Sequence, residues 1–292
     1  MSEATIQLVV TSFVNILVLS SIYILVALGF AFLFSIMGIL NFAHGAIYMV
    51  GGYICYQFAV VYGVNQWLSL LLSVIIMGSF GLFLEKFCFR SFFGNINRTI
   101  VVTIAIIVIL QTTVNVTVGV YVRSLPSFVP GILQAGAISL SAERLATFII
   151  GGVLLALMMW FIRSTKVGQQ MQAVSQNLEG AALQGISINR ISALACAIAC
   201  SLAAVAGSLM GAIFNLSPFM GDYMLIEAIM IVILAGIGSF SGIFFAGLIV
   251  GSLDAILPLF VSGAASKAIA FGVIITILLF RPQGFFGREV EM

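Results

Sequence analysis

The chain has 292 residues, of which 62% are hydrophobic and only 7% are charged, and its formal net charge is +2. A soluble globular domain carries about 25% charged residues, so this chain has too few charges to cover a water-facing surface. The composition disfavours a secreted disulfide scaffold, a nucleic-acid-binding domain and a disordered tail. It predicts an all-α protein that crosses a membrane several times. The apolar runs are continuous, whereas the strands of a membrane β-barrel alternate apolar and polar residues.

Between Glu3 and Glu85 the chain has 85 − 3 − 1 = 81 residues without a formal charge. A membrane-spanning helix needs roughly 20 apolar residues, so this stretch must cross the bilayer more than once. The first run, 4–37, lacks the basic start of a cleaved signal peptide and is expected to be retained. It is longer than one span, so we expect a break inside it. Eight runs follow, of which the two flanking residues 236–242 are expected to be shortened or broken helices: 42–62, 67–84, 99–122, 145–162, 191–215, 224–237, 243–260 and 264–280.

Basic residues gather in three groups that hold eight of the eleven Lys and Arg residues. Connections rich in Lys and Arg face the cytoplasm, so we expect these groups and the C-terminus to be cytoplasmic. The side of the N-terminus stays open, because it depends on whether the first run crosses once or turns back. The groups are Lys86, Arg90 and Arg98; Arg163, Lys166 and Arg190; and Arg281 and Arg288. The opposite connections carry Arg123 and Arg144, partly balanced by Glu143.

No grouping of residues suggests an enzyme. The chain has no glycine-rich loop followed by Lys-Ser or Lys-Thr, so no nucleotide-binding P-loop is expected. A single histidine, His44, rules out a multi-histidine metal site. Cys196 and Cys200 lie one helical turn apart without an acid or histidine nearby, so we interpret them as buried small hydrophobic residues. Neither a catalytic residue nor a metal or cofactor of its own is expected in this chain.

Two polar residues stand out in the charge-free stretch. Asn41 and His44 are three residues apart, on one helical face, and Gly38 and Gly45 flank them. Polar groups at membrane depth need partners or water, so one interpretation is that they line a pathway near a backbone break. The alternative is a short interfacial turn between two spans, with both side chains solvated or capping a helix.

Three acids lie in the apolar last third of the chain: Asp222, Glu227 and Asp254. Each is near the end of a predicted segment, so exposure at the lipid headgroups is one explanation. The other is a polar vestibule that receives a substrate, and Glu227 is its best candidate because apolar residues follow it at once. The glycine-rich connection 236–242 permits tight turns and close approach of helices.

The longest polar segment of the chain is 163–190. Residues 165–184 contain no proline, and a modest apolar stripe recurs along them at helical spacing. This pattern predicts a short amphipathic helix outside the membrane. Such a helix can dock a soluble partner or lie against its own bundle and the lipid headgroups. The stripe consists of Val167, Met171, Val174, Leu178 and Ala182.

Three motifs together resemble one family. The run Ser21-Ile22-Tyr23-Ile24-Leu25-Val26-Ala27-Leu28-Gly29, followed by Asn41-Phe42-Ala43-His44-Gly45 and Tyr48, is similar to the N-terminal signature of inner-membrane permeases of branched-chain amino-acid ABC transporters. The same family's C-terminal pattern resembles Gly236-Ile237-Gly238-Ser239 with Gly242, and the ending Arg281-Pro282-Gln283-Gly284-Phe285-Phe286-Gly287-Arg288. The resemblance covers essentially the whole chain, in order, as one permease domain (1–292).

The polar segment adds to this resemblance. Glu179-Gly180-Ala181-Ala182-Leu183-Gln184-Gly185 is similar to the Glu-Ala-Ala-x-x-x-Gly coupling loop of ABC importers. It departs from that pattern at Gly180, where the family has alanine, and the proline-containing continuation of many importers is missing. The resemblance implies that Glu179, Ala181, Ala182 and Gly185 dock an ATPase, and this makes docking the preferred interpretation of segment 163–190.

The family implies a division of labour across a bacterial inner membrane. Two permease subunits, identical or homologous, form the path through the lipid bilayer. Two ATP-binding subunits, which hold ATP and Mg²⁺, dock from the cytoplasm, and an extracytoplasmic solute-binding protein delivers the solute. Branched-chain amino acids are the expected cargo, with urea or amides as the alternative in the same family. The residues assigned to the path are Asn41, His44, Tyr48, Glu227, Gly236 and Gly238.

A different class of transporter stays open as the rival. An autonomous secondary transporter or channel for a small polar solute would use buried ionisable groups as proton or ion sites. The residues available for that role are His44, Asp222, Glu227 and Asp254. Dependence of transport on ATP, as opposed to a proton or sodium gradient, separates the two classes.

Overall fold

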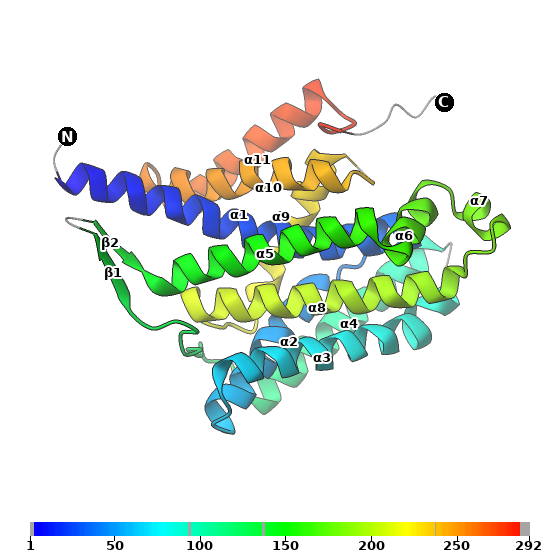
Figure 1. Cartoon of the computed structure of the whole chain (residues 1–292), viewed down its shortest axis with the longest axis horizontal. Helices are drawn as coiled ribbons and strands as arrows, with labels where there is room; N and C mark the ends of the chain where they lie inside the picture. The colour runs from blue at the N-terminus through cyan, green and yellow to red at the C-terminus, as the bar shows by residue number, and fades with distance from the viewer. Residues whose placement is uncertain (1–2, 93–94, 136–137, 237, 287–292) are drawn as a thin grey trace.

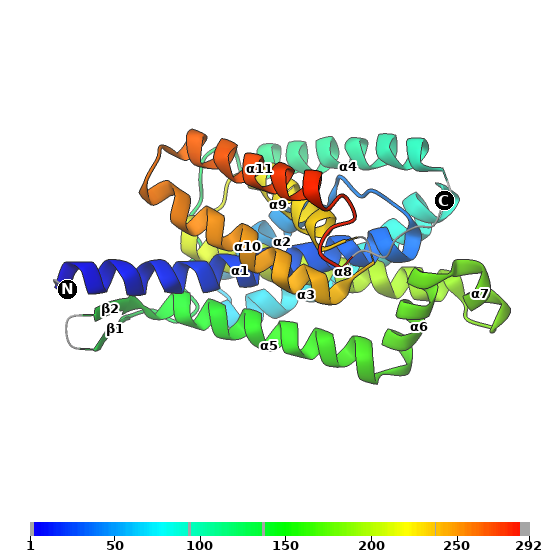
Figure 2. The same cartoon turned by 90° about the horizontal axis from the view of Figure 1, so that it is seen from above.

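The computed structural model describes residues 3–92, 95–135, 138–236 and 238–286. Within them the chain forms an elongated helical bundle with one short antiparallel hairpin (Figures 1 and 2). The helices are α1 (Glu3–Met37), α2 (His44–Tyr56), α3 (Gln66–Leu84), α4 (Ile96–Thr117), α5 (Ala142–Ser164), α6 (Lys166–Gln176), α7 (Leu178–Leu183), α8 (Ile188–Phe214), α9 (Met220–Ala235), α10 (Phe240–Ile256) and α11 (Gly263–Phe280). The hairpin strands are β1 (Ile132–Ala135) and β2 (Ile138–Ser141), with Ile132 opposite Ser141.

Seven of the described helices are long and apolar enough to cross a membrane. This confirms the expected all-α bundle of membrane-spanning helices. Two further helices, α2 and α9, are shorter, with 13 and 16 residues. A single π-helical turn, Gln57–Val61, extends α2, and another, Glu85–Phe89, extends α3. The hairpin was not expected from the sequence.

The first apolar run contains no break, so that expectation is wrong. Helix α1 continues for 35 residues, because the run has no proline and its one glycine, Gly29, packs closely against α8 and the ring of His44. The interruption comes after the run, at Gly38, whose φ of +64° lies in the left-handed region that glycine tolerates. The start of α1 lies at one end of the bundle, and α1 runs toward the other end (Figure 1).

The expectation of two shortened helices around residues 236–242 is half right. Helix α9 is short, as expected. Helix α10 is not, because a 3₁₀ turn (Leu257–Leu259) extends it to a candidate span of 20 residues. The second short helix is instead α2, which starts late because residues 38–43 run back from the end of α1 without helical structure.

The expected amphipathic helix over 165–184 is broken in two at Asn177. This residue is extended, with φ −154° and ψ 105°, and its side-chain oxygen accepts a hydrogen bond from Gly180 N at 2.8 Å. Asn177 thus ends α6 and caps α7. The break turns α7 away from α6, so that α7 projects at one end of the molecule (Figures 1 and 2).

The core of the bundle is built around α1, α2 and α8. In the most apolar window of α1, 83% of the residues are buried inside the protein. Glycines bring the neighbouring helices into backbone contact: a Cβ atom at Gly207 of α8 would overlap the carbonyl of Tyr48, and one at Gly45 of α2 would overlap Gly221 of α9. Helices packed by small residues in this way are typical of membrane proteins, where apolar lipid gives no hydrophobic drive for association.

The basic groups meet at one end of the bundle. The α3–α4 connection and helices α6 and α7 lie opposite the start of α1 and the β1–β2 hairpin (Figures 1 and 2). The tail 281–286 lines a cavity together with the end of α5 and with α6, at the same end. The three basic connections expected on one side of the membrane are therefore on one side of the protein. Residue Arg288 of the third group lies outside the described residues.

Candidate functional site

Asn41 and His44 lie where the chain enters the bundle interior. Both are fully buried, so neither is the solvated residue of an interfacial turn. Asn41 does cap this turn: its side-chain oxygen accepts a hydrogen bond from Ala43 N, and its carbonyl accepts one from His44 N, both at 3.1 Å. The turn therefore begins α2 inside the protein and holds two polar side chains at depth.

The polar contacts of these two side chains are incomplete. His44 Nε2 lies 3.1 Å from the carbonyl oxygen of Val26 in α1, and because a carbonyl only accepts, Nε2 must carry the proton. The ring also contacts Phe30, with centroids 6.1 Å apart. Within the described part of the chain, His44 Nδ1 and Asn41 Nδ2 have no hydrogen-bond partner. An unsatisfied polar atom is costly in an apolar interior, and both atoms are closed off from solvent by the surrounding residues.

Tyr48 follows one turn later on α2. Its side chain is buried and its carbonyl touches Gly207 of α8. The same face of α2 continues with Gly51 and Gly52, which contact Ala204 and Gly207 of α8. Tyr48 therefore lies in a close backbone contact between α2 and α8.

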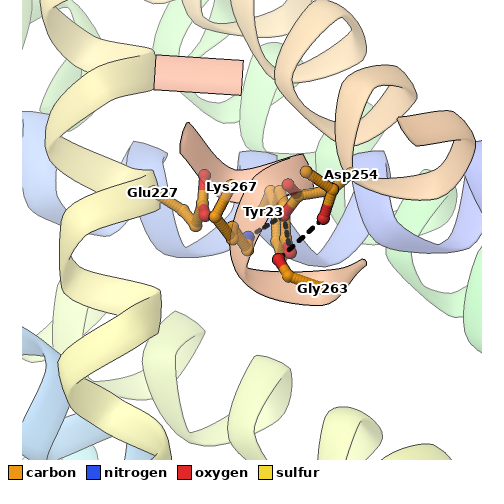
Figure 3. A network of polar contacts seen from close by, with 6 residues as sticks. Tyr23, Glu227, Asp254, Gly263 and Lys267 are labelled. Carbon is orange, nitrogen blue, oxygen red and sulfur yellow. Dashed lines mark hydrogen bonds and ion pairs between the residues drawn. The ribbon is translucent and has the colours of Figure 1, made fainter. Parts of the chain in front are cut away.

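A network of charged groups surrounds Glu227 (Figure 3). Lys267 Nζ of α11 donates to Glu227 Oε1 of α9 at 2.5 Å and also to Asp254 Oδ2 of α10. Tyr23 OH of α1 donates to Asp254 Oδ2 at 2.6 Å. We call these four residues the ion network. It joins four helices, and the side chains of Glu227 and Asp254 are largely buried within it, whereas Asp222 is exposed and accepts a bond from Gln111.

The charges of the ion network do not balance. Two carboxylates share one ammonium group, and Glu227 Oε2 is buried without a partner among the described residues. Buried charges persist when they are paired, and an excess acidic oxygen in the interior is a place for a cationic group. Tyr23 and Val26 are three residues apart on α1, an axial rise of about 4.5 Å, so the ion network and His44 attach to neighbouring points of one helix.

Sequence reasoning missed Tyr23 and Lys267 as site residues. A signal for Lys267 existed, because it is the one Lys or Arg between Arg190 and Arg281. A base alone in such an apolar region needs an acidic partner, and Glu227 and Asp254 are two of the three acids of the same region. Tyr23 had no comparable signal, since a tyrosine in a span is commonly packed as an aromatic residue.

Gly236 and Gly238 lie apart from Glu227, at the end of α9. Both have positive φ, +89° and +84°, and form the turn into α10. The C-terminal tail binds this turn: Phe285 N donates to Leu234 O at 2.8 Å and Phe286 N to Ala235 O at 3.1 Å. The two C-terminal motifs of the sequence therefore meet in space. Ile237, Gly287 and Arg288 of these motifs lie outside the described residues.

A cavity of about 710 Å³ opens beside this turn. The end of α5, one face of α6, the α9–α10 turn and the tail enclose it, with Arg163, Gln172, Gly238 and Gln283 among its lining residues. The cavity lies at the end of the bundle that carries the basic connections. It connects the turn at Gly238 with α6, the helix that leads into α7.

Segment 163–190 has one part that packs against the bundle and one part that is exposed. Met171 and Val174 of α6 are buried against the bundle, as the apolar stripe predicted. In α7 the predicted stripe is wrong, because the break at Asn177 turns Ala181 inward and leaves Leu178 and Ala182 exposed. Leu183 is 87% exposed and Glu179 is exposed beside it. Gly185, with φ +79°, closes α7 by donating from its N–H to Ala182 O at 2.9 Å.

These features define a class of protein: a multi-pass membrane permease, with unsatisfied polar atoms inside its bundle and a short exposed helix projecting from one end. Residues 12–278 match the family described as "Branched-chain amino acid transport system / permease component". The chain belongs to this family, which consists of subunits of transport systems.

Named relatives agree over nearly the full length. The chain is 31% identical to the high-affinity branched-chain amino acid transport system permease protein LivH of Salmonella typhimurium, over 95% of each chain. It is 31% identical to the corresponding BraD of Pseudomonas aeruginosa, over 95% of this chain and 96% of that one. A probable LivH of Methanocaldococcus jannaschii is 24% identical, over 94% and 91%.

Proposed function

We propose that this chain is the permease subunit of an ABC importer that moves branched-chain amino acids across a bacterial inner membrane. The observation that carries the proposal is the family match over residues 12–278, together with relatives whose names state this transport. The chain supplies the path, and ATP with Mg²⁺ is bound and hydrolysed on partner subunits. A second permease subunit, identical or homologous, completes the path.

The distribution of basic residues supports an orientation for the bundle. All three basic connections lie at one end, and such connections face the cytoplasm. The helices α6 and α7 and the C-terminus are then cytoplasmic. The N-terminus and the β1–β2 hairpin face outward, where a solute-binding protein delivers the solute.

The exposed surface of α7 suits the docking of an ATP-binding subunit. The apolar side chain of Leu183 is almost fully exposed, and Glu179 and Ala182 are exposed on the same short helix. Behind α7, helix α6 packs on α1, α5 and α8. A movement of α7 would therefore reach α1, which bonds to His44 through Val26 and to the ion network through Tyr23. In this way ATP hydrolysis would switch the path between its two open states.

The interior suits a solute that must be released again. An amino acid carries one ammonium and one carboxylate group, and the path offers single polar atoms at Asn41, His44 and Glu227. Gly236 and Gly238 shape the turn at the cytoplasmic end, beside the cavity of about 710 Å³. Few polar atoms give weak binding along the path, so high affinity is assigned to the solute-binding protein.

Co-purification tests the docking. We expect Leu183→Asp to abolish capture of the ATP-binding subunits by the detergent-extracted chain, because it places a charge in an apolar contact. Glu179→Lys and Gly185→Val should weaken capture as well. The matched control is Leu133→Asp, an exposed leucine of the hairpin at the opposite end. Undiminished capture by Leu183→Asp would refute docking at α7.

Reconstitution separates the ABC importer from a gradient-driven transporter. In proteoliposomes containing all subunits, leucine uptake should require ATP and should persist when an ionophore removes the proton gradient. The chain alone should not accumulate leucine. Accumulation driven by a proton or sodium gradient, without ATP-binding subunits, would assign the ion network to ion coupling and overturn the proposal.

A further inference from the structure

A second cavity, of about 400 Å³, lies at the end of the bundle opposite α7. It is enclosed by the N-terminal half of α1, the β1–β2 hairpin, the start of α5 and the end of α8, which meet beside the N-terminus (Figure 1). We call it the reception pocket. Its volume is in the range of sites for small molecules. Neither the ion network nor His44 takes part in lining it.

Glu143 supplies a negative group to the reception pocket. It is the second residue of α5, and its side chain lines the cavity although the residue is only 5% exposed. Its Oε2 accepts a hydrogen bond from Val129 N at 3.0 Å, which ties down the preceding loop. Its Oε1 is buried without a partner among the described residues. A carboxylate oxygen left in this way is stabilised by an ammonium group.

Arg144 supplies a positive group beside it. One guanidinium nitrogen donates to the side-chain oxygen of Asn15 in α1, which leaves most of its five N–H donors unused. In the described part of the chain no ion pair joins Arg144 to Glu143, so the two charges do not neutralise each other directly. A guanidinium held in a fixed position is suited to bind a carboxylate through two parallel hydrogen bonds.

The remaining wall includes apolar side chains. Val14 of α1, Leu140 of β2, and Ala212 and Ile213 of α8 line the pocket together with small hydroxyl groups. A negative group, a positive group and an apolar patch in one small cavity match the three parts of an α-amino acid with an aliphatic side chain. A simple cation would not use Arg144, and a simple carboxylic acid would not use Glu143.

The rim of the pocket is held in place before any ligand arrives. Gln7 of α1 donates to Ser139 O at 2.8 Å and accepts from Ser139 N at 2.9 Å, so the hairpin is fixed to α1. Glu143 fixes the loop at Val129. A preformed site loses little conformational entropy on binding, which favours the capture of a small solute.

We propose that the reception pocket binds the amino acid as it enters from the extracytoplasmic side. The Glu143 carboxylate binds the ammonium group, Arg144 binds the carboxylate of the amino acid, and Val14 and Ile213 contact its aliphatic side chain. The inference rests on the proposed function, because it takes both the class of solute and the outward orientation from it. It adds a first binding place on this chain, ahead of the interior path.

Binding of three ligands to the purified chain, without the solute-binding protein, tests this assignment. The ligands are leucine, leucinamide, which lacks the carboxylate, and 4-methylpentanoate, which lacks the ammonium group. We expect Glu143→Gln to weaken leucine and leucinamide roughly tenfold or more in dissociation constant and to leave 4-methylpentanoate unchanged. Arg144→Gln should weaken leucine and 4-methylpentanoate and leave leucinamide unchanged. Asp222→Asn, an exposed acid bonded to Gln111, is the matched control.

Three results would overturn the reception pocket. The first is a wild-type chain that shows no saturable leucine binding. The second is a pair of variants that bind all three ligands as the wild type does. The third is a pair of variants that lose all three ligands equally, because such a loss indicates disrupted packing. ATP-driven leucine uptake by the assembled importer is measured in parallel. If the wild-type importer takes up leucine while the ligand pattern is missing, the reception pocket alone is refuted. If uptake itself is missing, the proposed function fails.

Discussion

Helices α1 and α11 are held in the bundle by different means. In the most apolar window of α1, 83% of the residues are buried, against 17% for α11. Glycines of α10 press on α1, where Gly247 contacts Ile24 and Gly251 contacts Ser20. Helix α11 buries three side chains, Ser266, Ala270 and Ile274, and is tied to α9 and α10 through Lys267.

The difference shows two ways to join helices in an apolar solvent. Shape complementarity of small residues gains dispersion energy over a long contact, and it leaves no room for a larger side chain. An ion network needs only a few atoms and works across a loosely packed interface, but it fails when one partner is lost. Helix α1 is held mainly by the first means, and the less buried helix α11 depends on the second.

The largest expected effect comes from enlarging a glycine in the interior. A side chain at Gly207 would overlap the carbonyl of Tyr48, which belongs to the backbone of α2 and cannot rotate away. We expect Gly207→Leu to destabilise the bundle by about 3 kcal/mol or more and to abolish monodisperse extraction in detergent. Thermal unfolding followed by size-exclusion chromatography measures this.

The matched control is Gly272→Leu on α11. No atom lies within 4 Å of a Cβ atom built at Gly272. Its melting temperature should stay close to that of the wild type. An equal decrease of the melting temperature in the two variants would show that the interior is not packed more closely than the periphery. It would contradict the difference in packing between α1 and α11.

A smaller effect is expected when Lys267 is neutralised. Lys267→Met leaves Glu227 and Asp254 facing each other without a cation, and both side chains are nearly buried. Removing one partner of a buried pair costs roughly 3–5 kcal/mol, and the lower end applies here because the Lys267 side chain is 38% exposed. Helix α11 should loosen, as faster amide hydrogen exchange in residues 263–280 would report.

Neutralising the acids as well separates charge from packing. The triple variant Lys267→Met, Glu227→Gln and Asp254→Asn removes every charge of the ion network and should recover much of the lost stability. Slow exchange in α11 would then return. A triple variant as unstable as Lys267→Met would show that the methylene stem of Lys267, and not its charge, holds the helix.

The smallest expected effect concerns the tail. Gly284 has φ +75°, and a Cβ atom there would crowd Gly236 N. We expect Gly284→Ala to cost about 1–2 kcal/mol locally and to release the hydrogen bonds of Phe285 and Phe286 without unfolding the bundle. Hydrogen exchange of residues 284–286 measures this release. Gly263→Ala, at an open position with ordinary φ, should leave the exchange unchanged.

The sequence predicts the spans well because each rests on a continuous apolar run. Helix α3, for example, covers 66–84 where 67–84 was expected. The break placed inside the first run was wrong because length alone suggested it, whereas a break needs a residue such as Gly38 that leaves helical geometry. The hairpin was missed because eight residues in two short strands give no periodic signal that exceeds that of a loop.

The sequence predicted several of the candidate site residues, but it did not predict how they are arranged in space. The depth of Asn41 and His44 depends on residues 38–43 running back into the bundle, which no local pattern encodes. Glu227 was singled out, but its partner Lys267 lies 40 residues further on, and Tyr23, which bonds to the shared acid Asp254, lies on α1. In α7, one extended residue, Asn177, exchanged the roles of Ala181 and Ala182.

The central position of α1 has a consequence for biosynthesis. The helices that enclose it, α5, α8, α9 and α10, are all translated after it. During translation α1 therefore enters the bilayer with lipid on every side, and each later helix must displace acyl chains from its surface. The faces of α1 that contact those helices thus exchange lipid for protein only when the later helices arrive. Substitutions along these faces should therefore lower the yield of assembled protein before they affect transport turnover.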